Sequence, residues 1–147
     1  GVNSDNTSYQ KNKLDLKPVL SLKARATSVK EINKDDSVSY GRTYIADRNR
    51  KIASISIGYA DGIPRCLSNK DILVKVNGYY AKVIGRICMD QCVIDVTDVK
   101  EIKTGDVVYI IDSNDINLSS EKLAMNADTI TNELLSRLGN RLPRIKS

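Results

Sequence analysis

The side chains best suited to chemistry lie in four short segments of this 147-residue chain: SYGRTY at 39–44, IGYADG at 57–62, GRICMDQ at 85–91 and TITNELL at 129–135. The segments offer phenol, thiol, carboxylate and guanidinium groups, but the chain contains no histidine. A free phenol has a pKa of about 10, so Tyr40 needs cationic or hydrogen-bonding help to exchange protons near neutral pH. With no histidine available, we expect that help to come from another domain.

Tyr40 has two interpretations. A lone tyrosine in a strand-rich chain is most often an aromatic residue packed on a sheet surface. The neighbouring Gly41 favours a functional interpretation, because glycine permits a close backbone approach or an unusual φ beside the phenol.

The three cysteines, Cys66, Cys88 and Cys92, argue against two kinds of site. A tetrahedral zinc site lacks obvious ligands, so we predict no metal. Cys88 lacks a partner base in the sequence, and a buried inert thiol is the more common case. The low, odd count also argues against a disulfide framework and favours a reducing, cytoplasmic setting.

Composition fits one soluble domain. Hydrophobic residues make up 41 %, enough for a core, and no apolar run approaches the roughly 20 residues of a membrane span. The net charge of +5 comes from interspersed basic and acidic residues, and the only aromatic residues are tyrosines. A nucleic-acid surface needs a clustered basic stripe with stacking rings, so we predict no nucleic-acid partner.

Periodicity predicts a mainly β domain, an antiparallel barrel or sandwich with one or two short C-terminal helices. Alternation indicates strands over 20–26, 38–45, 53–57, 72–76, 79–84, 87–96 and 107–111. Asn77-Gly78 indicates a type I′ hairpin. A helix with a Ser N-cap is expected near 122–125, and Ile130, Leu134 and Leu138 repeat as on a second helix. Residues 1–14 read as a tail or interdomain linker, and 15–147 as the domain.

The four segments, in this order, closely resemble the C-terminal domain of alanine racemases, and RLPR at 141–144 resembles that family's ending. The resemblance implies a homodimer in which an N-terminal α/β barrel holds pyridoxal phosphate on a lysine that this chain lacks. Each active site would join the barrel of one subunit to the C-terminal domain of the other. The reaction implied is the racemisation of alanine, which supplies D-amino acids for peptidoglycan precursors.

The resemblance also assigns roles to single residues. Tyr40 matches the tyrosine base, and Met89 the residue whose main-chain N–H binds the substrate carboxylate, with Cys88 and Asp90 beside it. Tyr59 matches the narrow end of the substrate passage, and Arg65 and Arg86 lie further out along it. Other interpretations stay open: Met89 as core filler, the two arginines as solvated surface. Asp61 beside Gly62 reads as a turn residue.

One position departs from the family pattern, because Asn132 stands where a tyrosine usually contacts the cofactor phosphate and narrows the pocket. We predict that its smaller amide opens the site and hydrogen-bonds a hydroxymethyl side chain, which would admit serine beside alanine. This resembles the membrane-anchored serine/alanine racemases of glycopeptide resistance (VanT type). Neutral drift at a helix start is the alternative.

Two further functions are weighed. The chain could be a stand-alone β-barrel that binds an anionic partner, or a dimerisation module without catalysis. The sequence opens with GVNS and no Met, which favours a piece of a longer protein. We therefore expect a domain that is inactive alone and cytoplasmic, in a parent protein that the VanT resemblance would anchor to the membrane.

Overall fold

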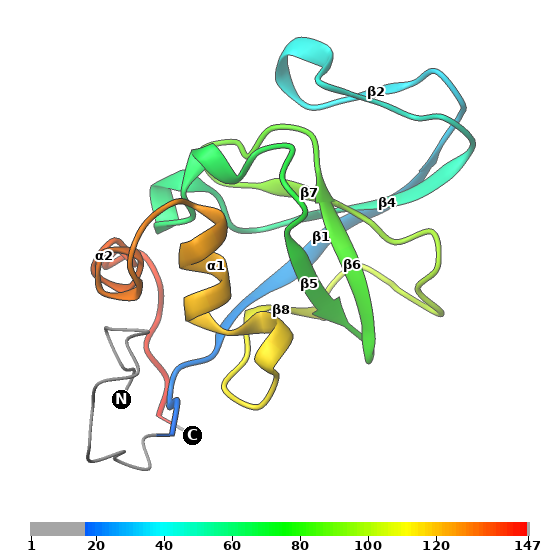
Figure 1. Ribbon diagram of the computed structural model, residues 1–147. Coiled ribbons are helices and arrows are strands. Elements are labelled where there is room, and N and C mark those ends of the chain that lie inside the picture. Colours follow the sequence, from blue (N-terminus) through cyan, green and yellow to red (C-terminus); the bar gives the residue numbers. More distant parts are fainter. Residues whose placement is uncertain (1–16, 147) are drawn as a thin grey trace.

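Six antiparallel strands close into a barrel in the order β1–β4–β7–β6–β5–β8 (Figure 1). The computed structural model describes residues 17–146. The strands are β1 (Leu22–Ile32), β4 (Arg50–Ile55), β5 (Leu73–Val76), β6 (Tyr79–Ile84), β7 (Cys92–Asp95) and β8 (Val107–Ile111). The predicted β-rich barrel with two short helices is confirmed, while the predicted tail at 1–14 lies outside the described residues.

The hairpin and the last strand follow the sequence signals. Asn77 and Gly78 both have positive φ, 49° and 83°, as a type I′ turn requires, and they join β5 to β6. β8 covers the apolar run at 107–111, after a turn in which Gly105 has a φ of 95°. Closure of the barrel then pairs β8 with β1 and removes the open sheet edges.

Two predicted strands are largely replaced by turns, and β1 and β4 also differ in extent from the predicted 20–26 and 53–57. Over 38–45 the chain forms β2 (Ser37–Val38), the 3-10 turn η1 (Tyr40–Arg42) and β3 (Tyr44–Ile45) in place of one strand. Ser39, Gly41 and Arg42 have left-handed backbone, which ends the alternation of side chains between the two faces of a strand. Over 87–96 only 92–95 is strand, because Cys88 N–H donates to the Gln91 carbonyl and closes a turn.

The two helices cover one end of the barrel. α1 (Ser120–Asn126) contributes Leu123 and Ala124 to the main core, and the Ser119 hydroxyl caps it by accepting from Lys122 N–H. α2 (Thr131–Ser136) contributes Leu134, which is fully buried. Ile130, which the repeat had placed on this helix, is the exposed N-cap of α2.

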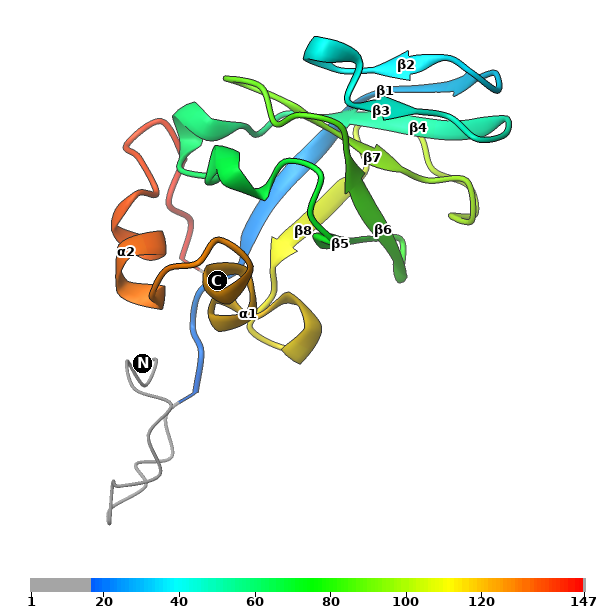
Figure 2. The same ribbon diagram turned by 45° about the horizontal axis from the view of Figure 1, so that its top comes forward.

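A small lobe, residues 33–49, lies at the opposite end of β1 and β4 from the helices (Figures 1 and 2). β2 and β3 pair with each other and not with the barrel. A second hydrophobic cluster under the lobe joins it to the barrel, through Ile32, Val38, Ala46, Ile52 and Ile84. The lobe carries Tyr40, so this cluster helps to set where the phenol stands.

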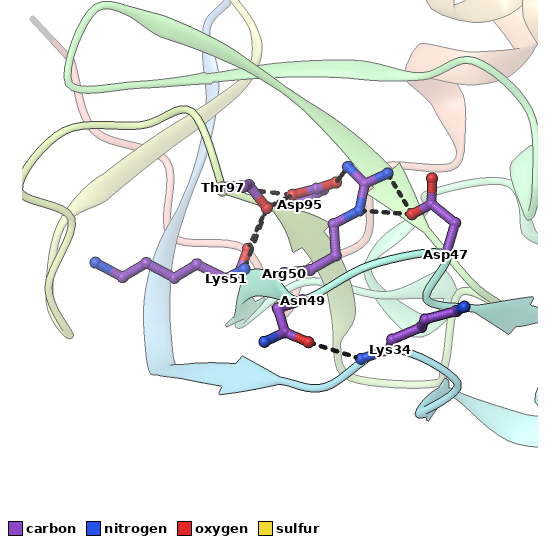
Figure 3. Close-up of polar contacts among 7 residues, drawn as sticks. All are labelled: Lys34, Asp47, Asn49, Arg50, Lys51, Asp95 and Thr97. Carbon is purple, nitrogen blue, oxygen red and sulfur yellow. Dashed lines mark hydrogen bonds and ion pairs between the residues drawn. The ribbon is translucent and has the colours of Figure 1, made fainter.

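A charged network also ties the lobe to the barrel (Figure 3). Arg50, at the start of β4, donates to Asp47 on the lobe's return loop and to Asp95 on β7, each at 2.7 Å. The hydrogen bonds that Arg50 donates to Asp47 raise the pKa of Arg50 and lower that of Asp47. Thr97 then holds the second Asp95 oxygen at 2.6 Å, so the guanidinium has a fixed partner on each side.

Candidate active site

The backbone around Tyr40 has an unusual conformation. Ser39, Gly41 and Arg42 have φ values of 65°, 73° and 50°, so three of four consecutive residues are left-handed. Such conformations cost energy for residues other than glycine and gather at functional sites. The result is a turn that holds the Tyr40 side chain outward, 73 % exposed. Its hydroxyl makes no hydrogen bond to any residue in 17–146.

Arg86 lies directly beside this turn. A Cβ built on Gly41 would stand 3.2 Å from a guanidinium nitrogen of Arg86, so the absence of a side chain at 41 leaves room for the arginine. Arg86 is half-buried and has no ion-pair partner in the described part of the chain. The Arg86 guanidinium therefore lies next to the Tyr40 turn. The sequence resemblance placed Arg86 along a substrate passage and did not predict this neighbour.

The segments 57–62 and 85–91 are held together through their backbones. Tyr59 N–H donates to the Cys88 carbonyl at 3.0 Å, and Ala60 N–H donates to the Met89 carbonyl at 2.9 Å. Gly58 fits beneath them, since a Cβ there would lie 2.3 Å from the Cys88 oxygen. The yellow-green 85–91 segment lies between the lobe and η2 (Tyr59–Asp61) in both views. Three of the four predicted segments are thus brought together.

Met89 has one paired and one unpaired main-chain group within the described residues. Its carbonyl is taken by Ala60, whereas its N–H donates no hydrogen bond within residues 17–146. The side chain is 52 % exposed, so core filling is not its role in this domain. Tyr59 beside it is 39 % exposed. An unpaired main-chain donor at an exposed loop can bind a carboxylate.

Asp61 is the residue that sequence reasoning most underestimated. It is only 6 % exposed, and one of its oxygens accepts from Gly58 N–H at 2.9 Å. Its other oxygen faces the Arg141 guanidinium at 3.6 Å, and Arg141 also donates to Asp90 at 2.5 Å. The hydrogen bond that Arg141 donates to Asp90, more than the charge of Asp61, raises the pKa of Arg141. The RLPR ending was a signal for Arg141, but nothing in the sequence pairs it with Asp61.

The remaining predicted residues lie around this centre. Arg65, in the turn η3 (Arg65–Leu67), and Asn132, in the first turn of α2, are both exposed, and neither side chain is hydrogen-bonded within the described range. Cys88 is half-buried and its thiol points to the Arg86 carbonyl at 3.6 Å. Cys92 is buried in the barrel, where desolvation, with a smaller effect of Cys88, raises its thiol pKa to about 12.

The described residues hold no group of three or more side chains that could bind a metal ion. Among the helices of residues 17–146, none is long and apolar enough to cross a membrane. The groups that could face a cofactor are the Tyr40 phenol and the Asn132 amide, both exposed and without partners in this range. They fit a cofactor held mainly by another part of the protein, which they would approach from one side.

The fold is a closed barrel with an exposed phenol and a main-chain N–H that both lack a hydrogen-bond partner within residues 17–146. A family model described as "Alanine racemase, C-terminal domain" matches residues 19–146. The chain belongs to the alanine racemase family, as its C-terminal domain.

Individual relatives agree. The alanine racemase of Clostridium perfringens is 44 % identical over 137 residues, which cover 92 % of this chain and 35 % of that protein. The alanine racemase of Halothermothrix orenii is 43 % identical over 134 residues, 90 % of this chain and 35 % of that protein. The chain therefore spans about a third of the length of the curated relatives it matches.

Solved structures share the fold. Alanine racemase from Clostridium difficile 630 in complex with cycloserine has a TM-score of 0.82 and 32 % identity, covering 90 % of this chain and 34 % of that chain. Alanine racemase from Bartonella henselae with covalently bound pyridoxal phosphate has a TM-score of 0.83 and 36 % identity, covering 92 % of this chain and 37 % of that chain.

Proposed function

We propose that this domain completes the active site of a pyridoxal-phosphate-dependent racemase that interconverts L- and D-alanine, and that Tyr40 is one of its two acid/base groups. The observation that carries the proposal is the Tyr40 turn, which holds a phenol outward without any partner in the described chain. A tyrosine that served only packing would have its ring covered.

Racemisation requires a proton to leave one face of the α-carbon and another to arrive on the opposite face. A bound pyridoxal phosphate acts as an electron sink that makes the α-proton removable. One base cannot serve both faces, so a group must stand opposite the lysine that the rest of the protein would supply. Tyr40 takes this place: its hydroxyl gives or accepts the proton on its own face.

Two cations and one donor support this role. The Arg86 guanidinium lies beside Gly41, in the turn that carries the phenol. The unpaired Met89 N–H binds the substrate carboxylate and so orients the α-carbon. Arg65, exposed at η3, attracts the same carboxylate toward the site.

Serine is proposed as a second substrate. Asn132 is exposed at the start of α2, and its amide can donate to and accept from a hydroxymethyl group. A polar partner discriminates such a hydroxyl better than an apolar pocket does. Exchange to the family's usual residue, Asn132→Tyr, should lower the serine-to-alanine ratio of kcat/KM in the full-length protein. An unchanged ratio would remove Asn132 from substrate selection.

The wider context is also proposed. The parent protein would be a homodimer whose N-terminal barrel domain meets this domain across the subunit interface. It would act in the cytoplasm and supply D-amino acids for peptidoglycan precursors. If serine is a true substrate, a membrane-anchored parent that serves glycopeptide resistance fits best.

Subunit mixing tests the proposal. The full-length protein should racemise alanine, whereas Tyr40→Phe and a variant lacking the cofactor lysine should each be inactive. When the two variants are co-expressed, about half the dimers are mixed and one of their two sites is intact, so about a quarter of the activity should return. No racemisation by the wild type would refute the function, and no recovery on mixing would refute the shared site.

A further inference from the structure

Three segments from distant parts of the sequence meet at one arginine. We call this meeting point the Arg141 junction: residues 58–61, 88–91 and 139–141. Arg141 donates to Asp90 at 2.5 Å and faces Asp61 at 3.6 Å. Gly139 N–H adds a hydrogen bond to the Asp61 carbonyl at 3.4 Å. The C-terminal arm is therefore attached to both loops that carry the predicted substrate contacts.

The two acidic residues have different surroundings. Asp90 is half exposed, but Asp61 is only 6 % exposed. A buried carboxylate needs compensation, and Asp61 receives it from Gly58 N–H on one oxygen and from Arg141 on the other. Arginine suits this position because its planar fork reaches two carboxylates at once, which a lysine ammonium cannot reproduce.

The Arg141 junction anchors the chain on the C-terminal side of Met89. Met89 is joined on its carbonyl side to Ala60 at 2.9 Å, and the next residue is held by Arg141. The peptide N–H of Met89 is the only group of this residue's main chain that is free within 17–146. That N–H shares a peptide plane with the Cys88 carbonyl, which accepts from Tyr59 N–H, so its direction depends on how the two loops lie against each other. Arg141 holds both loops, through Asp61 on one and Asp90 on the other.

We propose that Arg141 is a positioning residue, which aims the Met89 N–H and thereby sets the affinity of the site for the substrate carboxylate. This inference rests on the proposed function. It predicts that loss of Arg141 weakens binding of any carboxylate ligand, because a misdirected donor forms a poorer hydrogen bond. It also predicts a smaller effect on the proton-transfer steps at Tyr40, since the lobe is anchored elsewhere through Arg50.

The test uses the full-length protein and propionate, which is alanine without its amino group, as a competitive inhibitor. Arg141→Gln should raise the inhibition constant of propionate and the KM of alanine together, by about tenfold, while kcat falls less. Asp90→Asn should raise both by a smaller factor. The double variant should be no worse than Arg141→Gln alone, because both changes break one contact. If Arg141→Gln does not fold, Arg141→Lys and Asp90→Asn carry the same test.

Arg144→Gln is the matched control, since Arg144 lies on the same arm and, among the described residues, its side chain donates only to the Leu138 carbonyl, at 3.2 Å. It should leave both constants within twofold. An unchanged propionate constant in Arg141→Gln, or an equal rise in Arg144→Gln, would overturn the positioning role. A wild type that does not racemise would overturn the proposed function and this inference with it, so the two failures are distinguishable.

Discussion

Gly58 is the position at which one added methyl group should do most to displace the site. Its backbone is extended, with a φ of −149°, so alanine meets no conformational penalty there. The obstacle is contact: the new Cβ would lie 2.3 Å from the Cys88 oxygen and 2.4 Å from the Met89 oxygen. Both are backbone atoms, which cannot swing aside as a flexible side chain could.

The structure gives the size of the displacement. Ordinary contact begins at 3.4 Å, so the two loops must separate by about 1.1 Å in Gly58→Ala. The hydrogen bonds that Tyr59 and Ala60 donate to the same two carbonyls would lengthen with them. A misplacement of about 1 Å at a substrate-positioning group can cost about 100-fold in rate. We expect a loss of that order in kcat/KM for alanine.

The assay is racemisation of L-alanine by the full-length protein, followed by circular dichroism or a coupled D-amino-acid oxidase. Gly139→Ala is the matched control, because within residues 17–146 its Cβ would find only the Ala60 carbonyl within 4 Å, at 3.8 Å. That variant should keep kcat/KM within about threefold. Gly58→Ala with activity equal to the control would refute the argument that these two loops fix the substrate contact.

Two further predictions concern the scaffold. Gly78→Val places a β-branched residue at a φ of 83°, and its Cβ would meet no atom of the described residues within 4 Å. Backbone strain alone should therefore cost about 1–2 kcal/mol and lower the Tm by several degrees, with racemisation unchanged; an unaltered Tm would count against the type I′ turn. Because the folded Cys92 thiol has a pKa of about 12 against an ordinary 9.0, the unfolded chain loses this proton first as pH rises. Its contribution to stability should therefore be complete below pH 9 and fall between pH 9 and 12, a fall that Cys92→Ala should remove; at pH 8 iodoacetamide should label exposed Cys66 but leave Cys92 unlabelled until the protein unfolds.

Local signals predicted those parts of the fold that local physics determines. Asn77-Gly78 carries its own turn geometry, and Ser119 caps α1 through a contact three residues away. The strand predicted over 38–45 failed because its alternation continues through a turn made of left-handed residues, and only Gly41 among them signals this conformation. Ile130 fits a helical period, but it precedes α2 and is exposed.

For the candidate site, too, the sequence predicted what a local segment encodes and missed what depends on distant contacts. Tyr40 and Met89 each lie inside a recognisable segment, so the sequence could single them out; the Tyr40 side chain is exposed, and the Met89 N–H donates no hydrogen bond within residues 17–146. Asp61 could not be singled out, because its role depends on Arg141, 80 positions away along the chain. The contact between Arg86 and Gly41 likewise spans two segments, and no periodicity encodes a contact between a side chain and a distant glycine.

The most direct test of the account is α-proton exchange in D₂O by the full-length protein with Tyr40→Phe. The phenylalanine keeps the ring but has no proton to give or accept. Racemisation should fall by at least about a thousandfold, while one enantiomer of alanine still exchanges its α-proton with solvent through the remaining base and keeps its configuration. If Tyr40→Phe instead racemised alanine at a rate near that of the wild type, Tyr40 would not be the second base and the account would be wrong.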